Sequence, residues 1–340
     1  MRGRVKHRTR VHWHVVLAIR IAVSAALLTF LLSKAGIHTL GHTLSNASLA
    51  WLLAGLALGF AGSAAQITQW HGLLRSLQLK RSWLRCARLE YAGNALDAAL
   101  PTSIGGDLVR AYYAGEGPDR VPAATSVVLR RVCNLPGLVL IMGFATLVNL
   151  PNAYAARITP YATVGAAGGA CVVALFTTPA LSIFLNLKVF GGPRIGAIAV
   201  KLHAAVTQVR GRELAIAAGR GIVFWVIVSL SQYCYMRAVG VHVPIVYAAL
   251  VVTTVNAISL LPISVGGYGL REGAFSAFLT VNGFAVAAQG VAVGVCLTGQ
   301  TLLLGLLGFP VLISLRRRAS ANEVADAQAF GAPLQESAAL

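Results

Sequence analysis

Charged residues, and acidic ones above all, are scarce in this sequence. Asp, Glu, Lys and Arg make up only 11% of its 340 residues, and ten acidic residues stand against 28 basic ones. Hydrophobic residues make up 57%, and the mean hydropathy is +0.73. Water cannot be the solvent for most of such a surface. The composition therefore excludes an ordinary soluble protein and predicts an integral membrane protein with no soluble domain.

Signatures of metal sites and of common enzymes are also lacking. The five cysteines are scattered, with no CxxC pair and no Cys/His cluster at metal-ligand spacing. The sequence contains no GxxxxGK[ST], HExxH or GxSxG motif. We therefore predict no metal, no cofactor and no catalytic residues, and we favour a protein that is not an enzyme.

The net charge of +18 would suggest a nucleic-acid partner in a soluble protein. Here the basic residues collect in short segments between apolar runs, as the positive-inside rule expects. Anionic lipid headgroups attract such segments. We therefore expect membrane lipids with anionic headgroups as partners, and no nucleic acid.

Six apolar stretches reach the length of about 20 residues that a spanning helix needs. They are Val15–Ser33, Leu49–Trp70, Val121–Leu150, Ile158–Ala180, Leu214–Val239 and Ala287–Leu315. Basic residues crowd both the first ten positions and Arg316–Arg318, which predicts that both termini are cytoplasmic. The tail from residue 319 to 340 is polar and alanine-rich, and we expect it to be disordered.

Two further apolar stretches, Ala92–Tyr112 and Val246–Phe284, are broken by proline and glycine. Irregular backbone at membrane depth is tolerated only where protein or water covers it. We interpret both stretches as re-entrant hairpins, the first entering from the cytoplasm and the second from outside.

The two broken stretches carry matching motifs. Four residues separate proline from the first glycine in both, Pro101 to Gly105 and Pro262 to Gly266, and nine residues separate each proline from Arg110 or Arg271. The prolines are 161 residues apart, and the same shift relates two pairs of predicted spans. We therefore predict an all-α polytopic membrane protein of two inverted repeats, an architecture found in transporters. The predicted parts are a basic N-terminus at 1–14, repeats at 15–150 and 151–318, and the tail at 319–340.

Each residue type in the motif has a physical role. Proline ends a half-helix, so Pro101 and Pro262 are predicted hinges, and paired glycines permit a tight reversal. A half-helix that begins there points free N–H groups at an anion, and arginine adds bidentate phosphate contacts. The predicted lipid-headgroup site consists of Asn94, Gly105, Gly106, Asp107, Arg110, Arg131, Asn256, Gly266, Gly267, Arg271 and Glu272.

Structural alternatives stay open for these residues. Glycine and proline are common in membrane helices for packing alone, and arginine near a helix end snorkels to the interface. Glu90, Asp97, Asp107 and Glu272 are candidates for pairing with the motif arginines, for carrying protons, or for structural salt bridges.

At these motifs the sequence resembles the flippase-like, or lysylphosphatidylglycerol synthase transmembrane, family. That family is similar to the membrane half of the bacterial multiple peptide resistance factor, which moves aminoacylated phosphatidylglycerol between leaflets. The resemblance implies lipid translocation in a bacterial inner membrane. The aminoacyl-transfer domain is not found in this sequence, so no lysine or alanine transfer is expected. The family's acidic residue three positions after the span arginine is replaced by Asn134.

Our leading hypothesis is a flippase that moves a phosphate-bearing phospholipid or glycolipid between leaflets. Without an ATP-binding motif, it would draw on a gradient, on an accessory protein, or on downhill flow. One alternative is a membrane-embedded transferase in which Asp97, Asp107 or Glu272 acts as a base or metal ligand. Another is an accessory subunit without transport. A homo-oligomer or a complex with a pathway enzyme is open in each case.

Overall fold

A computed structural model describes residues 22–27, 29–99, 105–115, 117–177, 209–260, 264 and 267–329. The described residues form helices and connecting turns and contain no strand, which confirms the all-α class. The helices are α2 (Ile37–Ser45), α3 (Leu49–Ser76), α4 (Trp83–Ala99), α5 (Gly105–Ala114), α6 (Arg120–Asn149), α7 (Thr159–Thr177), α10 (Gly211–Ala238), α11 (Ile245–Ser259), α12 (Leu270–Thr280) and α13 (Ala287–Ala329), with short 3₁₀ turns at Gly117–Asp119 and Ala153–Ala155.

Four helical segments in the described part of the chain are long and apolar enough to cross a membrane. They are Leu49–Ser76, Gly117–Asn149, Gly211–Ala238 and Ala287–Leu315, and each matches a predicted span. A fifth candidate combines the helix Ala22–Ala35 with α2, and the two meet at a bend of 79°. Gly36 makes this bend with a φ of 75°. The sixth predicted span corresponds to α7, and its residues 178–180 lie outside the described residues.

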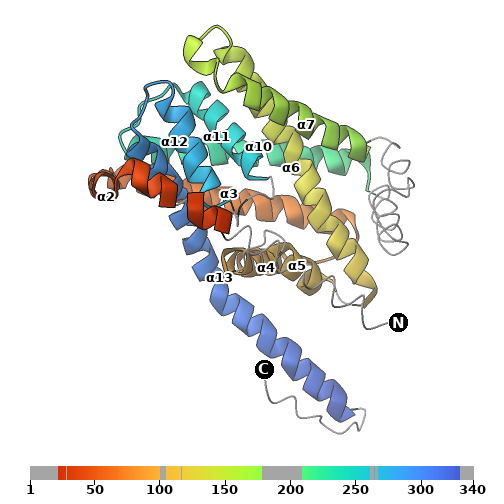
Figure 1. Cartoon of the computed structure of the whole chain (residues 1–340). Coiled ribbons are helices and arrows are strands. Elements are labelled where there is room, and N and C mark those ends of the chain that lie inside the picture. The colour runs from red at the N-terminus through yellow and green to blue at the C-terminus, as the bar shows by residue number, and fades with distance from the viewer. Residues whose placement is uncertain are drawn as a thin grey trace, which may run out of the picture.

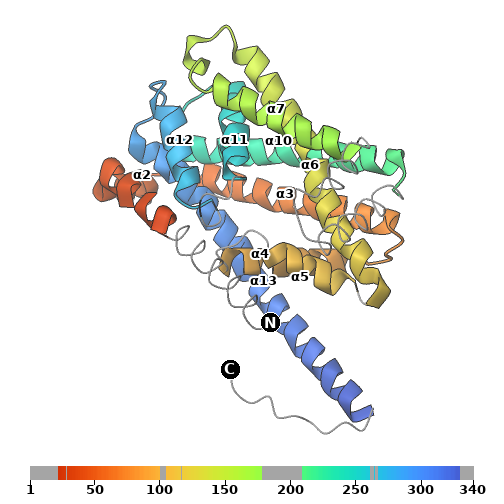
Figure 2. The same ribbon diagram turned by 45° about the vertical axis from the view of Figure 1, so that its right-hand side comes forward.

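Helices α3 and α10 run antiparallel through the centre of the molecule (Figures 1 and 2). Near one end of the pair, Ser231 Oγ donates a 2.7 Å hydrogen bond to the Gly55 carbonyl. Near the other end, Gln69 Nε2 donates a 2.8 Å bond to the Ala217 carbonyl. Two central helices from the two halves of the chain thus face each other in opposite directions, as the predicted inverted repeats require.

A helical hairpin lies on each side of this pair, one formed by α4 and α5 and the other by α11 and α12 (Figure 2). In the first hairpin, Arg85 Nη2 donates to the Tyr113 carbonyl at 3.2 Å, away from the tip. In the second, Tyr247 donates to the Phe278 carbonyl at 2.8 Å. Both helix pairs are therefore antiparallel. The tips, with Pro101, Pro262 and Gly266, lie outside the described residues, so the predicted hinges stay predictions.

The first hairpin is longer than the sequence predicted, because α4 begins at Trp83 rather than near Ala92. Ser82 precedes the helix, and its hydroxyl accepts a 3.2 Å hydrogen bond from the Arg85 N–H. This contact is a helix N-cap, and the following Leu, Arg, Ala and Glu residues favour helix. The prediction followed only the apolar stretch and missed these helix-forming polar residues.

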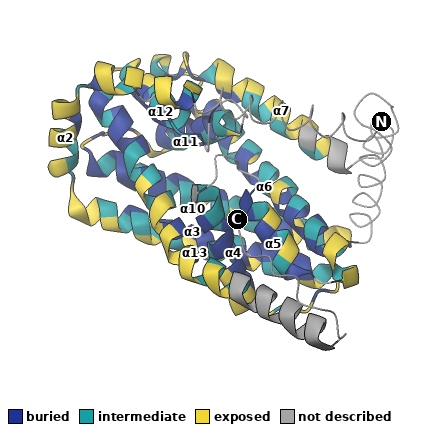
Figure 3. Cartoon of the chain, turned by 60° about the horizontal axis from the view of Figure 1, so that its bottom comes forward, coloured by how far each residue is buried: buried dark blue, intermediate teal, exposed yellow. Residues whose placement is uncertain are grey.

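Glycines allow the helices to approach closely, as is typical of membrane helix interfaces. A Cβ on Gly137 of α6 would lie 2.7 Å from the Gly221 carbonyl of α10, and one on Gly308 of α13 would overlap the Tyr91 carbonyl of α4. Large apolar side chains such as Phe144, Leu147 and Leu306 are exposed, and exposed residues line the outer faces of the bundle (Figure 3). These faces suit contact with lipid chains rather than water.

Helix α13 continues to Ala329, so residues 319–329 are helical where the sequence analysis predicted a disordered tail. Alanine is the strongest helix former, and the segment extends an already nucleated helix. Residues 330–340 lie outside the described residues. Helix α13 packs against α4, and α11 packs against α6, so each hairpin contacts a long helix from the other half of the chain. The assignment of repeats itself stays a prediction.

Candidate functional site

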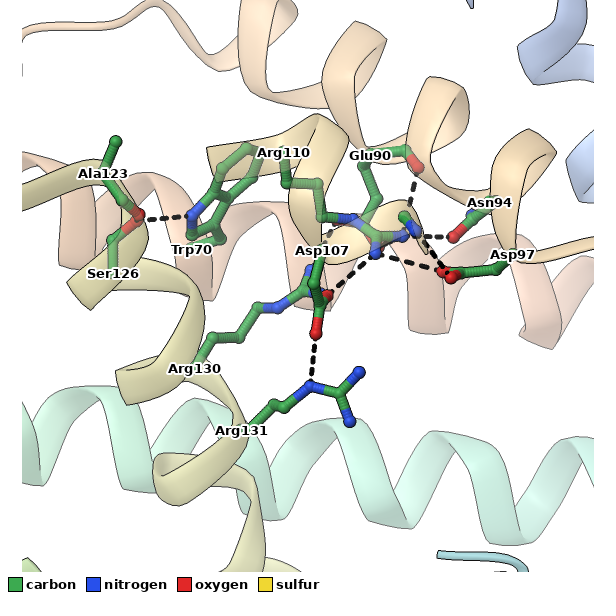
Figure 4. A network of polar contacts seen from close by, with 11 residues as sticks. Trp70, Glu90, Asn94, Asp97, Asp107, Arg110, Ala123, Ser126, Arg130 and Arg131 are labelled. Atoms are coloured by element: carbon green, nitrogen blue, oxygen red, sulfur yellow. Dashed lines mark hydrogen bonds and ion pairs between the residues drawn. The ribbon is translucent and has the colours of Figure 1, made fainter. Parts of the chain in front are cut away.

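Arg110 is the centre of a buried polar network in the first hairpin (Figure 4). Its side chain is 3% exposed. Nε donates to Glu90 Oε2 at 3.0 Å, and Nη1 donates to Asp97 at 3.2 Å and to Asp107 at 3.0 Å. Nη2 donates to Glu90 Oε1 at 3.2 Å and to Asn94 Oδ1 at 2.6 Å. A guanidinium has five N–H donors, and here the protein itself engages all five.

Two arginines of α6 complete the network. Arg130 contacts Glu90 and lies 3.4 Å from Asp107 Oδ1, and its guanidinium stands 5.8 Å from the centre of the Trp70 ring. Arg131 contacts the other oxygen of Asp107 and is 51% exposed. Three arginines and three carboxylates therefore cancel in formal charge. Such balance is needed because an unpaired buried charge costs several kcal/mol.

The N-terminus of α5 carries the anion that the sequence predicted, but the anion belongs to the protein. The Gly106 N–H donates a 2.8 Å hydrogen bond to Asp97 Oδ1, which places a carboxylate at the positive end of the helix. A Cβ on Gly106 would overlap both Asp97 and the Gly93 carbonyl. Glycine is required at this position so that α5 can approach α4. Gly105 is buried at the first position of α5.

Arg271, the motif arginine of the second hairpin, has different surroundings. The Arg271 side chain makes no hydrogen bond or ion pair with any residue that the structure describes, and its Nε is buried without a partner. The adjacent Glu272 is directed elsewhere, since one oxygen accepts the Gly269 N–H at 2.7 Å and the other accepts the Thr298 hydroxyl at 2.8 Å. Glu272 thus caps α12 and ties it to α13 rather than neutralising Arg271.

Arg271 lines a cavity of about 280 Å³ between the two hairpins. The first hairpin contributes Asn94 and Asp97, and the second contributes Asn256 and Arg271. The central helices and α13 supply the rest of the wall, namely Gly59, Gly62, Ser63, Gln66, Phe224, Trp225, Val228, Ser231, Gln232, Leu297, Gln300, Thr301 and Leu304. Asn256 Nδ2 lies 3.3 Å from Gln232 Oε1, which fixes one edge of this polar lining.

The predicted site residues thus fall into two places. Asn94, Asn256 and Arg271 meet at the cavity, while Asp107, Arg110 and Arg131 belong to the charged network beside it. Gly267 holds a turn with a φ of 83°, and a Cβ there would lie 3.3 Å from Arg271 Nη2. Glu272 faces away from the cavity, toward α13. Of the alternatives that the sequence left open for the carboxylates, Glu90, Asp97 and Asp107 form ion pairs with Arg110. Glu272 forms no ion pair with the motif arginines among the described residues.

Three glutamines of the cavity wall are absent from the site that the sequence predicts. Gln66, Gln232 and Gln300 come from α3, α10 and α13, each within a segment that is apolar enough to span a membrane. An amide in such a segment is costly to bury without a partner. Three glutamines in three predicted spans were therefore a usable signal of a shared polar site.

The family model for the lysylphosphatidylglycerol synthase TM region matches residues 17–308. The chain belongs to this family. The lysylphosphatidylglycerol synthase membrane family and the long apolar helices together make the chain a multi-pass membrane protein linked to lipid modification or transport. A search of curated proteins finds no match. The matched range contains both hairpins, the charged network and every residue of the cavity wall.

Proposed function

We propose that this protein is a flippase that carries the phosphate-bearing headgroup of a membrane lipid between leaflets. The observation that carries the proposal is the cavity between the two hairpins, in which Arg271 has no hydrogen-bond or ion-pair partner among the described residues. A buried cation without a partner is costly, and a phosphate can supply the missing charge and bidentate hydrogen bonds. The bulk of the lipid chains stays on the apolar outer faces while the headgroup passes through the polar interior.

Movement of the hairpins against each other would expose the cavity to one leaflet at a time. Transporters with inverted repeats alternate access in this way, with the substrate held near the repeat interface. The charged network gives the first hairpin a rigid contact with α6, through Arg130 and Arg131. The predicted contact between Arg110 and phosphate requires this network to open, since the guanidinium donors are engaged in the closed arrangement.

The carboxylates favour transport over the transferase hypothesis. Both oxygens of Asp97 accept hydrogen bonds, from the Gly106 N–H and from Arg110. Both oxygens of Glu272 are likewise engaged, and Asp107 contacts three arginines. A general base needs an available oxygen near the substrate.

We place the protein in a bacterial inner membrane, with both termini in the cytoplasm as its basic ends predict.

The test is a reconstituted assay in liposomes with fluorescent phosphatidylglycerol and fluorescent polyprenyl phosphate. We expect the unaltered chain to move at least one of these lipids, and Arg271→Ala to abolish that movement. Arg157→Ala serves as the matched control, because Arg157 is exposed and lies outside both the cavity and the network. Equal movement by the Arg271→Ala chain would refute the proposed role of the cavity. Correctly inserted protein that moves neither lipid would favour the accessory or transferase hypotheses.

A further inference from the structure

The cavity wall is rich in amides and hydroxyls but poor in charge. Five amide side chains and three hydroxyl side chains face the cavity, against a single cation and a single carboxylate. The carboxylate, Asp97, is already held by Arg110 and by the α5 N-terminus. The charge that the cavity presents to a ligand is therefore that of Arg271 alone.

Several amides have unused donors within the described part of the chain. Asn94 Oδ1 accepts from Arg110, and its Nδ2 donates to no described residue. Gln300 Oε1 accepts a hydrogen bond from the Tyr235 hydroxyl, and its Nε2 is left without a described partner. The Gln232 amide is in the same situation, because its oxygen accepts from Asn256.

Unused acceptors lie on the same wall. Asn256 donates through Nδ2 to Gln232 and to the Val252 carbonyl, and its Oδ1 accepts nothing from the described residues. Gln66 makes no side-chain hydrogen bond with them in either direction. A hydroxyl group both donates and accepts, whereas an ammonium group only donates. A wall that offers both donors and acceptors therefore matches the hydroxyl groups of a ligand better than an ammonium group.

An ammonium group would meet an unfavourable environment. It would lie close to Arg271, and the carboxylate that could compensate its charge is already neutralised by Arg110. Like charges at close range in a partly buried site destabilise binding. The cavity thus disfavours zwitterionic ethanolamine headgroups and cationic aminoacyl headgroups, including the lysyl group of the family's name.

The size of the cavity limits the ligand further. Its volume of about 280 Å³ lies just below the range of ~300 to 1,000 Å³ that is typical of ligand pockets. It equals roughly nine waters at ~30 Å³ each. That space suits one phosphate with one small polyol. Gly59 contributes to this space, since a Cβ there would lie 2.5 Å from the Gln300 amide.

We infer that the cavity selects a lipid whose single phosphate carries a small, uncharged, hydroxylated headgroup. Glycerol in phosphatidylglycerol and a monosaccharide on a polyprenyl phosphate are two sources of this chemistry. The inference rests on the proposed function for its location, but it concerns recognition and can be tested by binding alone. Arg271 would hold the phosphate, and the free amides would hold the hydroxyls.

The experiment is a lipid competition read by native mass spectrometry. The full chain in phosphatidylcholine nanodiscs is offered equal amounts of phosphatidylglycerol, polyprenyl hexosyl phosphate, phosphatidylethanolamine and lysylphosphatidylglycerol. We expect one or both hydroxylated lipids to be retained at least about tenfold above the two lipids with ammonium groups, a ratio that corresponds to about 1.4 kcal/mol. Comparison of phosphatidylglycerol with polyprenyl hexosyl phosphate shows whether glycerol or a hexose is the better headgroup.

Two variants of Gln232 test whether the charge of the cavity wall sets the lipid preference. Gln232→Glu places a carboxylate on the wall and should shift retention toward phosphatidylethanolamine by about fivefold or more. Gln232→Met keeps a similar volume without charge and should weaken binding without that shift. If both variants lower retention alike, packing rather than charge sets the preference and the inference fails.

The outcomes also separate the inference from the proposed function. Selective retention of hydroxylated lipids that depends on Arg271, without movement in liposomes, would support the inference and overturn transport. Equal transport of phosphatidylglycerol and phosphatidylethanolamine would leave transport standing and overturn the inference. Equal retention of all four lipids would also overturn it.

Discussion

The two hairpins carry the same arginine at the same distance from proline, yet they give it opposite surroundings. Arg110 lies among three carboxylates, whereas Arg271 has no ion pair in the described structure. When the two copies are aligned at the offset of 161 residues, the second copy has no acidic residue at the three positions where the first copy has its carboxylates. The residues that correspond to Glu90, Asp97 and Asp107 in the second copy are Val251, Ile258 and Tyr268.

This difference teaches that a shared backbone motif need not have a shared role. A neutralised arginine stabilises contacts between helices and has no donors left for a ligand. An arginine without a protein partner is costly in the absence of a ligand and is available to bind an anion. We therefore assign stability chiefly to the first hairpin and recognition chiefly to the second.

Replacing each arginine with alanine tests this assignment most directly. Arg110→Ala leaves Glu90, which is 2% exposed, and Asp97 without their main partner. Loss of one member of a buried pair costs about 3 to 5 kcal/mol, so we expect a large fall in melting temperature in detergent. Arg271→Ala orphans no carboxylate and removes a cation that is costly to bury, so its melting temperature should fall far less, if at all. Similar losses for the two variants would contradict the comparison.

The next largest loss of stability is expected where α4 and α5 approach each other closely. Gly106→Ala would force its Cβ against Asp97 and the Gly93 carbonyl, and overpacking of this kind costs about 1 to 3 kcal/mol. Gly143→Ala is the matched control, because nothing lies within 4 Å of its added Cβ. Thermal unfolding of both variants should show destabilisation only for Gly106→Ala. An unchanged melting temperature for that variant would mean that α5 can shift at no cost.

A carboxylate added near Arg271 should make the second hairpin resemble the first. Ser259 Cβ and Arg271 Nη2 lie 3.6 and 3.3 Å from the position that a Gly267 Cβ would occupy. Ser259→Asp should therefore pair with Arg271 and weaken phosphatidylglycerol binding about tenfold, in line with ~1.5 to 3 kcal/mol for hydrogen bonds to charged groups. Ser259→Asn is the uncharged control. Equal binding by the Asp and Asn variants would argue against neutralisation.

The smallest effect is expected at the rim of the charged network. Arg131 is 51% exposed and contacts Asp107, which has other arginine partners. Exposed ion pairs contribute up to about 1 kcal/mol, so Arg131→Ala should lower stability by less than that. Chemical unfolding of the Arg131→Ala and Arg110→Ala variants, measured side by side, would rank their losses of stability. A loss as large as that of Arg110→Ala would place Arg131 within the essential core of the network.

Much of the fold followed from the sequence because apolar length and basic flanks are local signals. Four long spans were predicted to within a few residues at most of their ends, and both hairpins were found. The start of α4 was missed because Ser82 and the polar residues after it indicate helix through capping and propensity, not through hydropathy. The helical part of the tail was missed because alanine-rich polar sequence suits both disorder and the extension of an existing helix.

The site was predicted less completely. The matching motifs identified both arginines, but only a three-dimensional structure could show that one is neutralised and the other is not. Arg110 and Glu90 are 20 residues apart, and Arg130 and Glu90 are 40 residues apart. The glutamines of the cavity come from three separate helices, and no sequence spacing relates them.

The sequence by itself determined that this chain is helical, lies in a membrane and carries two copies of a Pro, Gly-Gly and Arg motif. These properties depend on composition and on spacing along a single helix, which the bilayer constrains strongly. Tertiary structure decided which charges meet, because ion pairing depends on how helices from distant parts of the chain pack. It buried Arg110 among carboxylates and left Arg271 facing a polar cavity between the hairpins.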